Sequence, residues 1–453
     1  MRILITILLL IVEFKQVLLA QEDFLYFVNE SNEAIYSRLN IIENAEKELL
    51  VSYYIFGNDE ASLIFLALLL DKKEKNPEMD IRILLDAAGS KIDRSYLYYC
   101  EKKGIQIREF HPIPKLFPQF SKISITNFVY SVQNFNMRMH DKFIISDSSS
   151  FITGGRNIEN TYYGLSKRNF NDRDIYFYSK KLTKDVRKYY LTLWKSRYVQ
   201  RMNYSLRNKS KAGYKKAENK FASLKELIAR NRLNYEILYR DFHPLKIGIP
   251  FKKAVFLSAY DQEIDALNPV LLSTSLFNLT YKVRKSIIIQ TPYLLPTRPL
   301  FNLLDNLVKR KIDIQFITNS NCSTDVMPIS AAYDNQKKKF EKLGIDIYEY
   351  MGPHYMHSKS AVYDDSIALV GSYNVDPRSA NINTELVFII DDKNIAKKLK
   401  DIILEDKKNC VKVEKSDINS WGGYYGCERT EKEIMKYLIF RILTRFSIFY
   451  NQF

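Results

Sequence analysis

Short apolar runs separated by amphipathic stretches occupy most of the chain, and their order repeats. The runs that predict buried strands lie at residues 49–55, 80–85 and 104–107 in the first half, and at 287–293, 313–318 and 344–347 in the second. Stretches with helical character lie between them, for example at 61–73 and 299–311. Strands that alternate with helices predict an α/β fold with a largely buried sheet, and the repeat predicts that one unit occurs twice.

The duplication extends to the polar residues. One stretch reads His140-x-Lys142-x₄-Asp147-x₆-Gly154-Gly155-x-Asn157, and the other reads His357-x-Lys359-x₄-Asp364-x₆-Gly371-Ser372-x-Asn374. The chain has only five histidines, and two of them begin copies of one motif with the same internal spacing. Chance explains such a repeat poorly, so we interpret the two copies as parts of one site.

The residue types in this motif suit the cleavage of a phosphodiester. Apolar residues follow each lysine, so a strand should present His and Lys on one face, because residues i and i+2 point the same way. One imidazole can attack phosphorus while another protonates the leaving oxygen. The lysines would hold the phosphate oxygens. Backbone amides around Gly155 and Ser372, and the side chains of Asn157 and Asn374, can donate to the same oxygens.

The two stretches resemble the paired HxKxxxxD signatures of the phospholipase D superfamily. Residues 154–158 (GGRNI), followed by Tyr162-Tyr163-Gly164, look like the first signature of bacterial C-type cardiolipin synthases. Residues 371–385 (GSYNVDPRSANINTE) are similar to their second signature. The likeness is diffuse from about residue 32 to about residue 399. It implies duplicated units, each a mixed β-sheet flanked by helices, that share one active-site cleft.

The resemblance also implies roles for individual residues. The catalytic set would be His140, Lys142, His357 and Lys359, with His140 as nucleophile and His357 as general acid, and the motif aspartates Asp147 and Asp364 complete it. Each aspartate follows the motif strand, so we expect it to tether a turn through backbone hydrogen bonds rather than to transfer a proton.

A carboxylate downstream of each motif holds the histidine in this family and thereby sets its tautomer. In the second copy the matching residue is Glu385. In the first copy the best match is Asp174, although Asp172 competes with it.

The chain carries a formal charge of +16, from 68 Lys and Arg against 52 Asp and Glu. The excess favours an anionic partner, either nucleic acid or an anionic membrane surface. A compositional bias toward Lys, Ile, Asn and Tyr explains the charge about equally well. Hydrophobic residues make up 46% of the chain, which allows a full core.

The sequence shows no cluster with the spacing of metal ligands. The four cysteines (Cys100, Cys322, Cys410, Cys427) form no CxxC pair. Lysines would supply the positive charge that metal ions provide in other phosphodiesterases, so we expect neither a metal nor another cofactor. Cys410 and Cys427 could pair in an exported protein, although we favour two unrelated buried thiols.

These patterns divide the chain into five segments. They are a leader (1–20), a first unit (21–202), a basic linker (203–249), a second unit (250–406) and a basic-hydrophobic tail (407–453). The leader resembles a signal peptide cleaved after Ala20, although Glu13 and Lys15 interrupt its apolar run. An uncleaved, membrane-associating leader is the alternative. The tail would either lie in a membrane interface or pack on the core.

An insertion in the first half bears on the kind of substrate. His140 lies 36 residues after Gly104 whereas His357 lies 13 after Gly344, a difference of 23. The added segment is more apolar than basic, with Leu116, Phe117, Phe120, Phe128, Tyr130 and Phe135 against Lys115, Lys122 and Arg138. A nucleic-acid groove would hold more basic residues, whereas this composition suits a lip that enters the acyl region of a membrane. Alternatively, the insertion covers the core of its own unit.

The leading hypothesis is a phosphatidyl transferase that makes cardiolipin through a phosphohistidine intermediate. Phosphatidylglycerol, or phosphatidylethanolamine as the alternative donor, would lose its head alcohol, and a phosphatidylglycerol hydroxyl would accept the phosphatidyl group. Water as acceptor would make the site a phospholipase D, and a nucleic-acid substrate, which we do not expect, would make it a nuclease. We expect the protein on a membrane surface of the bacterial cell envelope, exported if the leader is a signal and facing the cytoplasm otherwise.

Overall fold

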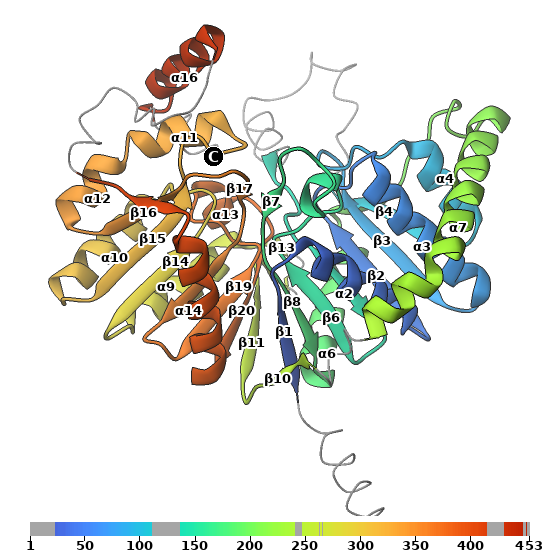
Figure 1. Ribbon diagram of the computed structural model, residues 1–453, viewed down its shortest axis with the longest axis horizontal. Helices are drawn as coiled ribbons and strands as arrows, with labels where there is room; N and C mark the ends of the chain where they lie inside the picture. The colour runs from blue at the N-terminus through green and yellow to red at the C-terminus, as the bar shows by residue number, and fades with distance from the viewer. Residues whose placement is uncertain are drawn as a thin grey trace, which may run out of the picture.

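The computed structural model describes residues 23–110, 136–240 (232–240 by backbone alone), 247–261, 263–264, 266–414, 430–446 and 450. Two β-sheets stand side by side with helices on their outer faces, and the first half of the chain forms one sheet while the second half forms the other (Figure 1). The expected leader and most of the apolar insertion lie outside the described residues.

The first unit is built on a nine-stranded sheet with the order β10-β1-β8-β6-β5-β2-β3-β4-β9. Its strands are β1 (Phe24–Val28), β2 (Glu48–Tyr53), β3 (Asp80–Asp86), β4 (Gln106–Phe110), β5 (Phe143–Ser146), β6 (Ser150–Gly154), β8 (Asp174–Tyr178), β9 (Val199–Arg201) and β10 (Ile249–Pro250). Its helices are α2 (Ser31–Glu43), α3 (Glu60–Lys75), α4 (Arg94–Lys102), the short η2 (Asn160–Tyr162), α6 (Lys180–Lys195) and α7 (Lys211–Arg240).

The second unit is built on an eight-stranded sheet with the order β11-β20-β19-β18-β14-β15-β16-β21. Its strands are β11 (Ala254–Ser258), β14 (Ser286–Gln290), β15 (Asp313–Asn319), β16 (Asp346–Tyr350), β18 (Ser360–Tyr363), β19 (Ile367–Gly371), β20 (Leu386–Asp391) and β21 (Cys410–Lys412). Its helices are α9 (Pro269–Tyr281), α10 (Arg298–Lys309), α11 (Met327–Asp334), α12 (Lys337–Leu343), α13 (Pro377–Asn381), α14 (Lys393–Lys407) and α16 (Glu431–Leu443). Two small pairs, β7 (Phe170–Asn171) with β17 (Tyr355–Met356) and β12 (Tyr260–Asp261) with β13 (Ala266–Leu267), complete the fold.

The strand pairing confirms the predicted duplication. In the first unit β2, β3 and β4 are parallel, while β2, β5, β6, β8 and β1 pair antiparallel. In the second unit β14, β15 and β16 repeat the parallel part, while β14, β18, β19, β20 and β11 repeat the antiparallel part. Both sheets are therefore mixed, as expected. The predicted strand pairs correspond to β2 and β14, β3 and β15, and β4 and β16.

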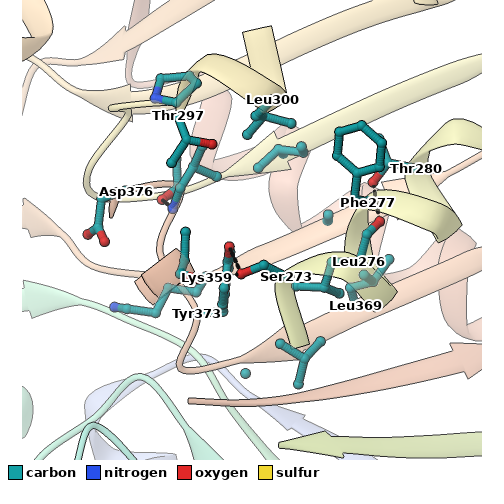
Figure 2. Close-up of a pocket in the computed structure, with 18 of the residues that line it drawn as sticks. Ser273, Leu276, Phe277, Thr280, Thr297, Leu300, Lys359, Leu369, Tyr373 and Asp376 are labelled. Atoms are coloured by element: carbon teal, nitrogen blue, oxygen red, sulfur yellow. Dashed lines mark hydrogen bonds between the residues drawn. The ribbon is translucent and has the colours of Figure 1, made fainter. Parts of the chain in front are cut away.

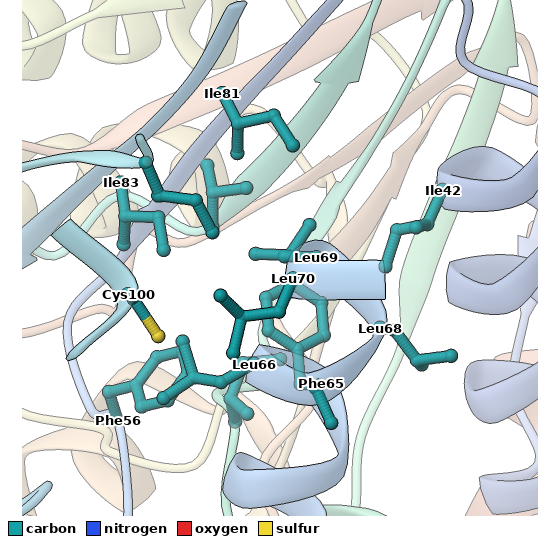
Figure 3. Packing of buried hydrophobic residues seen from close by; sticks show 14 of the residues in the cluster. Ile42, Phe56, Phe65, Leu66, Leu68, Leu69, Leu70, Ile81, Ile83 and Cys100 are labelled. Carbon is teal, nitrogen blue, oxygen red and sulfur yellow. The ribbon is translucent and has the colours of Figure 1, made fainter. Parts of the chain in front are cut away.

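The cores explain why the two units hold together. In the first unit, α3 is apolar on nearly all sides because it lies between the sheet and other helices, and Leu66, Leu69 and Leu70 are fully buried (Figure 3). A separate apolar cluster joins the two sheets. There Phe388 of β20 packs against Phe151 and Phe177, at ring-centroid distances of 5.2 and 5.0 Å. A contact of this kind fixes β20 of the second sheet relative to β6 and β8 of the first.

The segment between the units is more than a linker. We expected residues 203–249 to connect the units, but α7 covers the outer side of the first unit and buries Ala217, Phe221 and Leu224 in its core. The strand β10 then joins the first sheet through β1. The apolar residues spaced along α7 favour a packed helix over a solvated connection.

The expected boundary at residue 406 also lies too early. β21 adds to the second sheet beside β16, and α16 packs near α11, where the buried Tyr437 hydroxyl donates to Asp334. The remainder of α16 presents apolar side chains to solvent, namely Ile434, Met435, Ile439 and Ile442. Helix α16 therefore packs on the core through one side only.

The pairing of Cys410 considered above is wrong. Cys410 is a free, half-buried thiol and Cys100 is a free, buried one, whereas Cys322 is disulfide-bonded. Cys427 lies outside the described residues. Among the described helices, none combines the length and apolar character that crossing a membrane requires.

Candidate active site

The two motif histidines meet where the units exchange short backbone pairings. The His140 N–H donates to the Thr384 carbonyl of the second unit at 3.2 Å. Reciprocally, the His357 N–H donates to the Asn171 carbonyl of the first unit at 2.7 Å, beside the parallel pair β7 and β17. Each histidine is thus positioned by a strand end of its own unit and by a backbone carbonyl of the other unit.

Each motif histidine is held by a carboxylate of the opposite unit, so the two pairs are crossed between the units. Nδ1 of His140 lies 2.9–3.0 Å from the carboxylate oxygens of Glu385, and Nδ1 of His357 lies 2.6 Å from Oδ2 of Asp172. All four side chains are buried. An Nδ1–H that donates to a carboxylate leaves Nε2 as the lone-pair nitrogen of a neutral ring.

This arrangement corrects the expected partner of the first copy. The register shows that Asp172 is the counterpart of Glu385, since Gly154 pairs with Asp174 and Gly371 pairs with Val387, two residues later in each case. Asp174 contacts neither histidine and instead forms buried ion pairs with Arg38 at 3.0 Å and Arg156 at 3.4 Å. Glu385 does hold a histidine, but it is the histidine of the opposite unit.

The residues after the motif glycines support these carboxylates. The hydroxyl of Ser372 donates to Glu385 at 2.5 Å, and that of Ser379 donates to it at 2.7 Å. At the corresponding position of the first unit, a Cβ on Gly155 would lie 2.0 Å from Oδ1 of Asp172, so glycine leaves the room that Asp172 needs. Gly155 and Ser372 therefore position the carboxylates that in turn position the histidines.

The two lysines point back to their own histidines. Nζ of Lys142 donates to the His140 carbonyl at 2.6 Å, and Nζ of Lys359 donates to the His357 carbonyl at 2.5 Å and lies 3.0–3.3 Å from the ring nitrogens. Burial lowers the pKa of Lys142 to about 7, and burial lowers the pKa of Lys359 as well. Desolvated ammonium groups gain strongly from a bound phosphate, since its negative charge replaces the lost water.

The histidines differ in their electrostatic surroundings. Burial, together with the charges of Lys142 and Lys359, holds the pKa of His140 well below the usual histidine range. Burial and Lys359 also lower the pKa of His357, but the Asp172 carboxylate opposes them. The charge of His357 is among the causes that lower the pKa of His140, which places both histidines in one site. His140 is therefore the ring more firmly held in its neutral form.

The two carboxylates also differ. Burial raises the pKa of Glu385 to about 7. For Asp172, burial acts to raise the pKa, but the charges of His357 and Lys359 outweigh it and lower the pKa. The carboxylate on the His357 side therefore carries its negative charge more readily than the one on the His140 side, which stabilises an imidazolium at His357.

The motif aspartates lie away from this centre, so their place in the catalytic set is wrong. The Asp147 carboxylate accepts from the backbone N–H groups of Glu46, Lys47 and Glu48 at 2.8–3.0 Å. The Asp364 carboxylate accepts from those of Arg284, Lys285 and Ser286 at 2.7–3.2 Å. Each residue has a positive φ, near 50°, at a turn. They tether the turn to the start of β2 or β14, as we expected from their position.

The two motif asparagines differ from each other. The Asn157 side chain accepts from the Ile55 N–H at 3.0 Å and donates to the Tyr162 hydroxyl at 2.9 Å, so both of its ends are bound within the protein. The Asn374 side-chain oxygen is buried without a hydrogen-bond partner among the described residues. Asn157 thus acts as a structural clamp, whereas Asn374 retains hydrogen-bonding capacity.

Aromatic rings surround the histidines, and the sequence pattern singled out neither Tyr54 nor Phe170 among them. Tyr54 meets His140 edge-on at 5.1 Å, and Phe170 and Tyr162 meet His357 at 5.0 and 5.6 Å. Tyr54 and Phe170 lie just after a strand and in a two-residue strand, where no periodicity marks them. Within the described part of the chain, no three His, Cys, Asp or Glu side chains are grouped as a metal site would need.

Comparisons with known proteins agree with this architecture. The family model described as "Cardiolipin synthase, PLD-like domain" matches residues 39–194 and 278–407, one segment in each unit. Cardiolipin synthase C of Escherichia coli (strain K12) is 25% identical over 406 residues, which cover 82% of each chain. An uncharacterized protein of Helicobacter pylori (strain ATCC 700392 / 26695) is 26% identical over 393 residues, covering 81% of this chain and 76% of that protein.

A solved structure shares the fold of the whole chain. The crystal structure of phosphatidylserine synthase from Haemophilus influenzae Rd KW20 superposes with a TM-score of 0.67 and 16% identity, covering 97% of this chain and 99% of that one. The family model covers more than half of the 453 residues, including both histidine motifs and both units. The chain therefore belongs to the phospholipase D-like family described by the cardiolipin synthase domain model.

Proposed function

We propose that the protein is a phosphatidyl transferase, a cardiolipin synthase, that works through a phosphohistidine intermediate. The observation that carries this proposal is the crossed pair of histidines. Each Nδ1 is held by a buried carboxylate of the opposite unit, and both Nε2 atoms then belong to one site. Two imidazoles in fixed tautomers are what a two-step transfer on phosphorus requires. The relatives named cardiolipin synthase support the substrate class.

The electrostatics support a division of roles between the histidines. Nε2 of the neutral His140 attacks phosphorus, and the bond from phosphorus to the oxygen of the head alcohol breaks. His357, whose pKa the Asp172 carboxylate supports, gives its proton to that oxygen. His357 then takes the proton of the acceptor hydroxyl, whose oxygen attacks phosphorus and releases His140. With phosphatidylglycerol as donor and acceptor, the products are cardiolipin and glycerol.

The buried lysines would bind the phosphate during both steps. Lys142 and Lys359 come from opposite units and each lies within 3 Å of its own histidine backbone. Their ammonium groups would neutralise the oxygens of the phosphate as the trigonal-bipyramidal transition state forms. Asn374 lies after the Gly371-Ser372 turn, and the NH2 group of its side chain would donate to the phosphate oxygens. Phosphatidylethanolamine would serve as a donor by the same steps, with ethanolamine leaving.

We further propose that the protein works at a membrane surface. The exposed apolar residues of α16 are flanked by Lys432, Lys436 and Arg441, a composition that suits the interface of an anionic bilayer. The disulfide at Cys322 favours an oxidising compartment, which supports export by the leader. A reporter fused after Phe453 that is active only outside the cytoplasm would support export, and full cytoplasmic activity would refute it.

The decisive experiment for the function uses the purified protein and phosphatidylglycerol vesicles. Mass spectrometry of the lipids should show cardiolipin, and the aqueous phase should contain glycerol. Phosphatidic acid as the main lipid product would identify a phospholipase D instead. Cleavage of DNA or RNA without any lipid turnover would identify a nuclease. Lipid extracts of cells with and without the protein should differ in cardiolipin in the same direction.

A further inference from the structure

A cavity of about 400 Å³ lies in the second unit between its sheet and the helices α9 and α10 (Figure 2). This volume lies within the range of about 300–1,000 Å³ that small-molecule sites occupy. Its walls are mainly apolar, and they include Leu276, Phe277, Leu300, Leu304, Phe316 and Leu369. Among its lining residues, Val270 and Thr274 of α9 and Pro299 of α10 are exposed, so the cavity opens to the surface between these helices.

The cavity borders the catalytic centre at the motif lysine Lys359. Lys359, Ala361 and Tyr363 all line it. Alternate residues of a strand share one face, so the cavity extends along the sheet face that carries the motif lysine. The amine end of Lys359 points away from Leu276 and Phe277 in Figure 2, and its Nζ lies against His357. The carbon stem of Lys359 thus separates the cavity from the histidine site.

The duplicated fold shows which residues occupy the corresponding positions in the first unit. The helices α2 and α9 each have 13 residues and end at the same distance before β2 and β14, which makes Arg38 the counterpart of Leu276. Buried Arg38 pairs with Asp174 at 3.0 Å, and its guanidinium lies 5.4 Å from the ring centre of Tyr163. A second buried arginine, Arg156, also pairs with Asp174.

All of these bulky or charged groups are replaced in the second unit. The strand register aligns Asp174 with Val387, because they pair with the motif glycines Gly154 and Gly371. The shared motif spacing aligns Tyr163 with Ala380 and Arg156 with Tyr373. The four replacements, Leu276, Val387, Ala380 and Tyr373, line the cavity. The second unit therefore has apolar or uncharged cavity walls at the positions where the first has an ionic cluster.

The helix over the cavity is also unlike its counterpart. Residues 269–281 of α9 (PVLLSTSLFNLTY) contain no charged side chain, whereas α2 contains Glu33, Arg38 and Glu43. Val270, Leu271 and Tyr281 of α9 are exposed to more than two fifths of their surface. A charge-free helix with apolar residues on its outer side is typical of a surface that meets an apolar phase.

We propose that this cavity receives one acyl chain of the phospholipid whose phosphate is bound by the motif lysines. This inference rests on the proposed function and adds where the lipid tail lies. The chain enters between α9 and α10 from the membrane side, and the head-group phosphate reaches the histidines past the stem of Lys359. The cavity of the first unit, about 280 Å³ between α2, α3 and α7, is bordered by Arg38 and Tyr163 of the ionic cluster and not by the motif lysine Lys142, so the two units have different roles in holding one substrate.

The test compares two tryptophan substitutions. Leu276→Trp places a large ring in the cavity, whereas Leu206→Trp adds the same ring at a highly exposed position just before α7, outside the cavity and away from α9. The full-length protein is assayed on dioleoyl and dihexanoyl phosphatidylglycerol and on the soluble diester bis(p-nitrophenyl) phosphate. Leu276→Trp should lower kcat/KM for the dioleoyl lipid by about tenfold or more, since leaving only two methylenes in water corresponds to roughly that factor. Activity on the soluble diester should persist, and Leu206→Trp should match the wild type on all three substrates.

The outcomes separate this inference from the proposed function. A wild type that turns over the soluble diester but neither lipid would refute the proposed function. If the wild type turns over both lipids and Leu276→Trp shows the same chain-length preference as the wild type, the proposed role of the cavity is refuted while the proposed function stands. Photolabelling of the wild type with a long-chain diazirine fatty acid gives a second measurement that needs no variant. Label on peptides of α9 and α10 supports the cavity, and label confined to other segments overturns it.

Discussion

The crossed carboxylates predict that Glu385→Gln and Asp172→Asn impair different chemical steps. Glu385 belongs to the second unit but holds His140, the proposed nucleophile, and Asp172 belongs to the first unit but holds His357, the proposed acid. Both substitutions keep the size of the side chain and remove its charge. Glutamine is tolerable at 385 because burial already raises the pKa of Glu385 to about 7.

The size of the effect follows from the hydrogen bond that is weakened. A bond to a charged group contributes about 1.5–3 kcal/mol, and each 1.4 kcal/mol corresponds to a factor of about ten in rate. Loss of the Nδ1 contact at 2.9–3.0 Å should therefore slow attack by His140 by roughly 10- to 150-fold. Loss of the 2.6 Å contact of Asp172 should slow proton donation by a similar factor.

The assay measures the first-turnover release of the alcohol from two lipids. Phosphatidylglycerol has a leaving alkoxide that needs a proton, whereas phosphatidyl-p-nitrophenol has one that does not. Glu385→Gln should slow release from both lipids, and Asp172→Asn should slow release from phosphatidylglycerol alone. The exposed Glu405→Gln serves as the control for removing a carboxylate charge. The opposite pattern, with Asp172→Asn affecting both lipids, would refute the assignment of His140 as nucleophile.

Three further predictions follow from the site. Burial lowers the pKa of Lys142 to about 7, so kcat/KM should fall as the pH rises through that value and the lysine loses its charge. Lys142→Arg should shift the alkaline limb of the pH profile to higher pH, and an unchanged limb would contradict the role of Lys142. Turnover should be unaffected by EDTA, because lysines supply the positive charge, and dependence on an added divalent ion would contradict this. Asp364→Ala should lower the free energy of unfolding by about 1–3 kcal/mol, because three backbone N–H groups lose a partly exposed charged acceptor, and denaturant titration measures this loss. The kcat of the folded variant should stay within a few-fold of the wild type.

Much of the fold could be predicted from the sequence because the unit occurs twice. A single apolar run is ambiguous between a strand and a buried helix, but two runs in the same order, such as those of β2 and β14, support each other. The motif residues could be identified from the sequence for the same reason. His140 and His357 share their spacing to a lysine and a glycine turn, so their common chemistry is visible without coordinates.

The crossing of the carboxylates could not be predicted, because it depends on contacts between residues far apart in the chain. His140 and Glu385 are separated by 245 positions, and His357 and Asp172 by 185. Spacing within one copy suggested Asp174 as the carboxylate that holds a histidine, but Asp172, two residues earlier, is the one that does so. Only the register of β6 with β8, compared with that of β19 with β20, shows that Asp172 is the equivalent of Glu385.

The packing of α7 and the cavity under α9 were hidden for a different reason. The many Lys and Arg residues of α7 suggested a solvated linker, but its apolar residues Phe221 and Leu224 are spaced to cover one face. The cavity arises from side chains that are small or uncharged, and such positions carry no motif. Their meaning emerges only when each is compared with its counterpart in the other unit.

The central claim is that His140 forms a covalent bond to the phosphorus of the lipid. In His357→Ala the proposed acid and base are removed, so phosphatidyl-p-nitrophenol, which needs no acid to leave, should load the enzyme while transfer to an acceptor is blocked. Mass spectrometry of the full-length variant should then find a phosphatidyl group on the peptide that contains His140. An adduct on the His357 peptide of His140→Ala, together with an unmodified His140 in His357→Ala, would contradict the account.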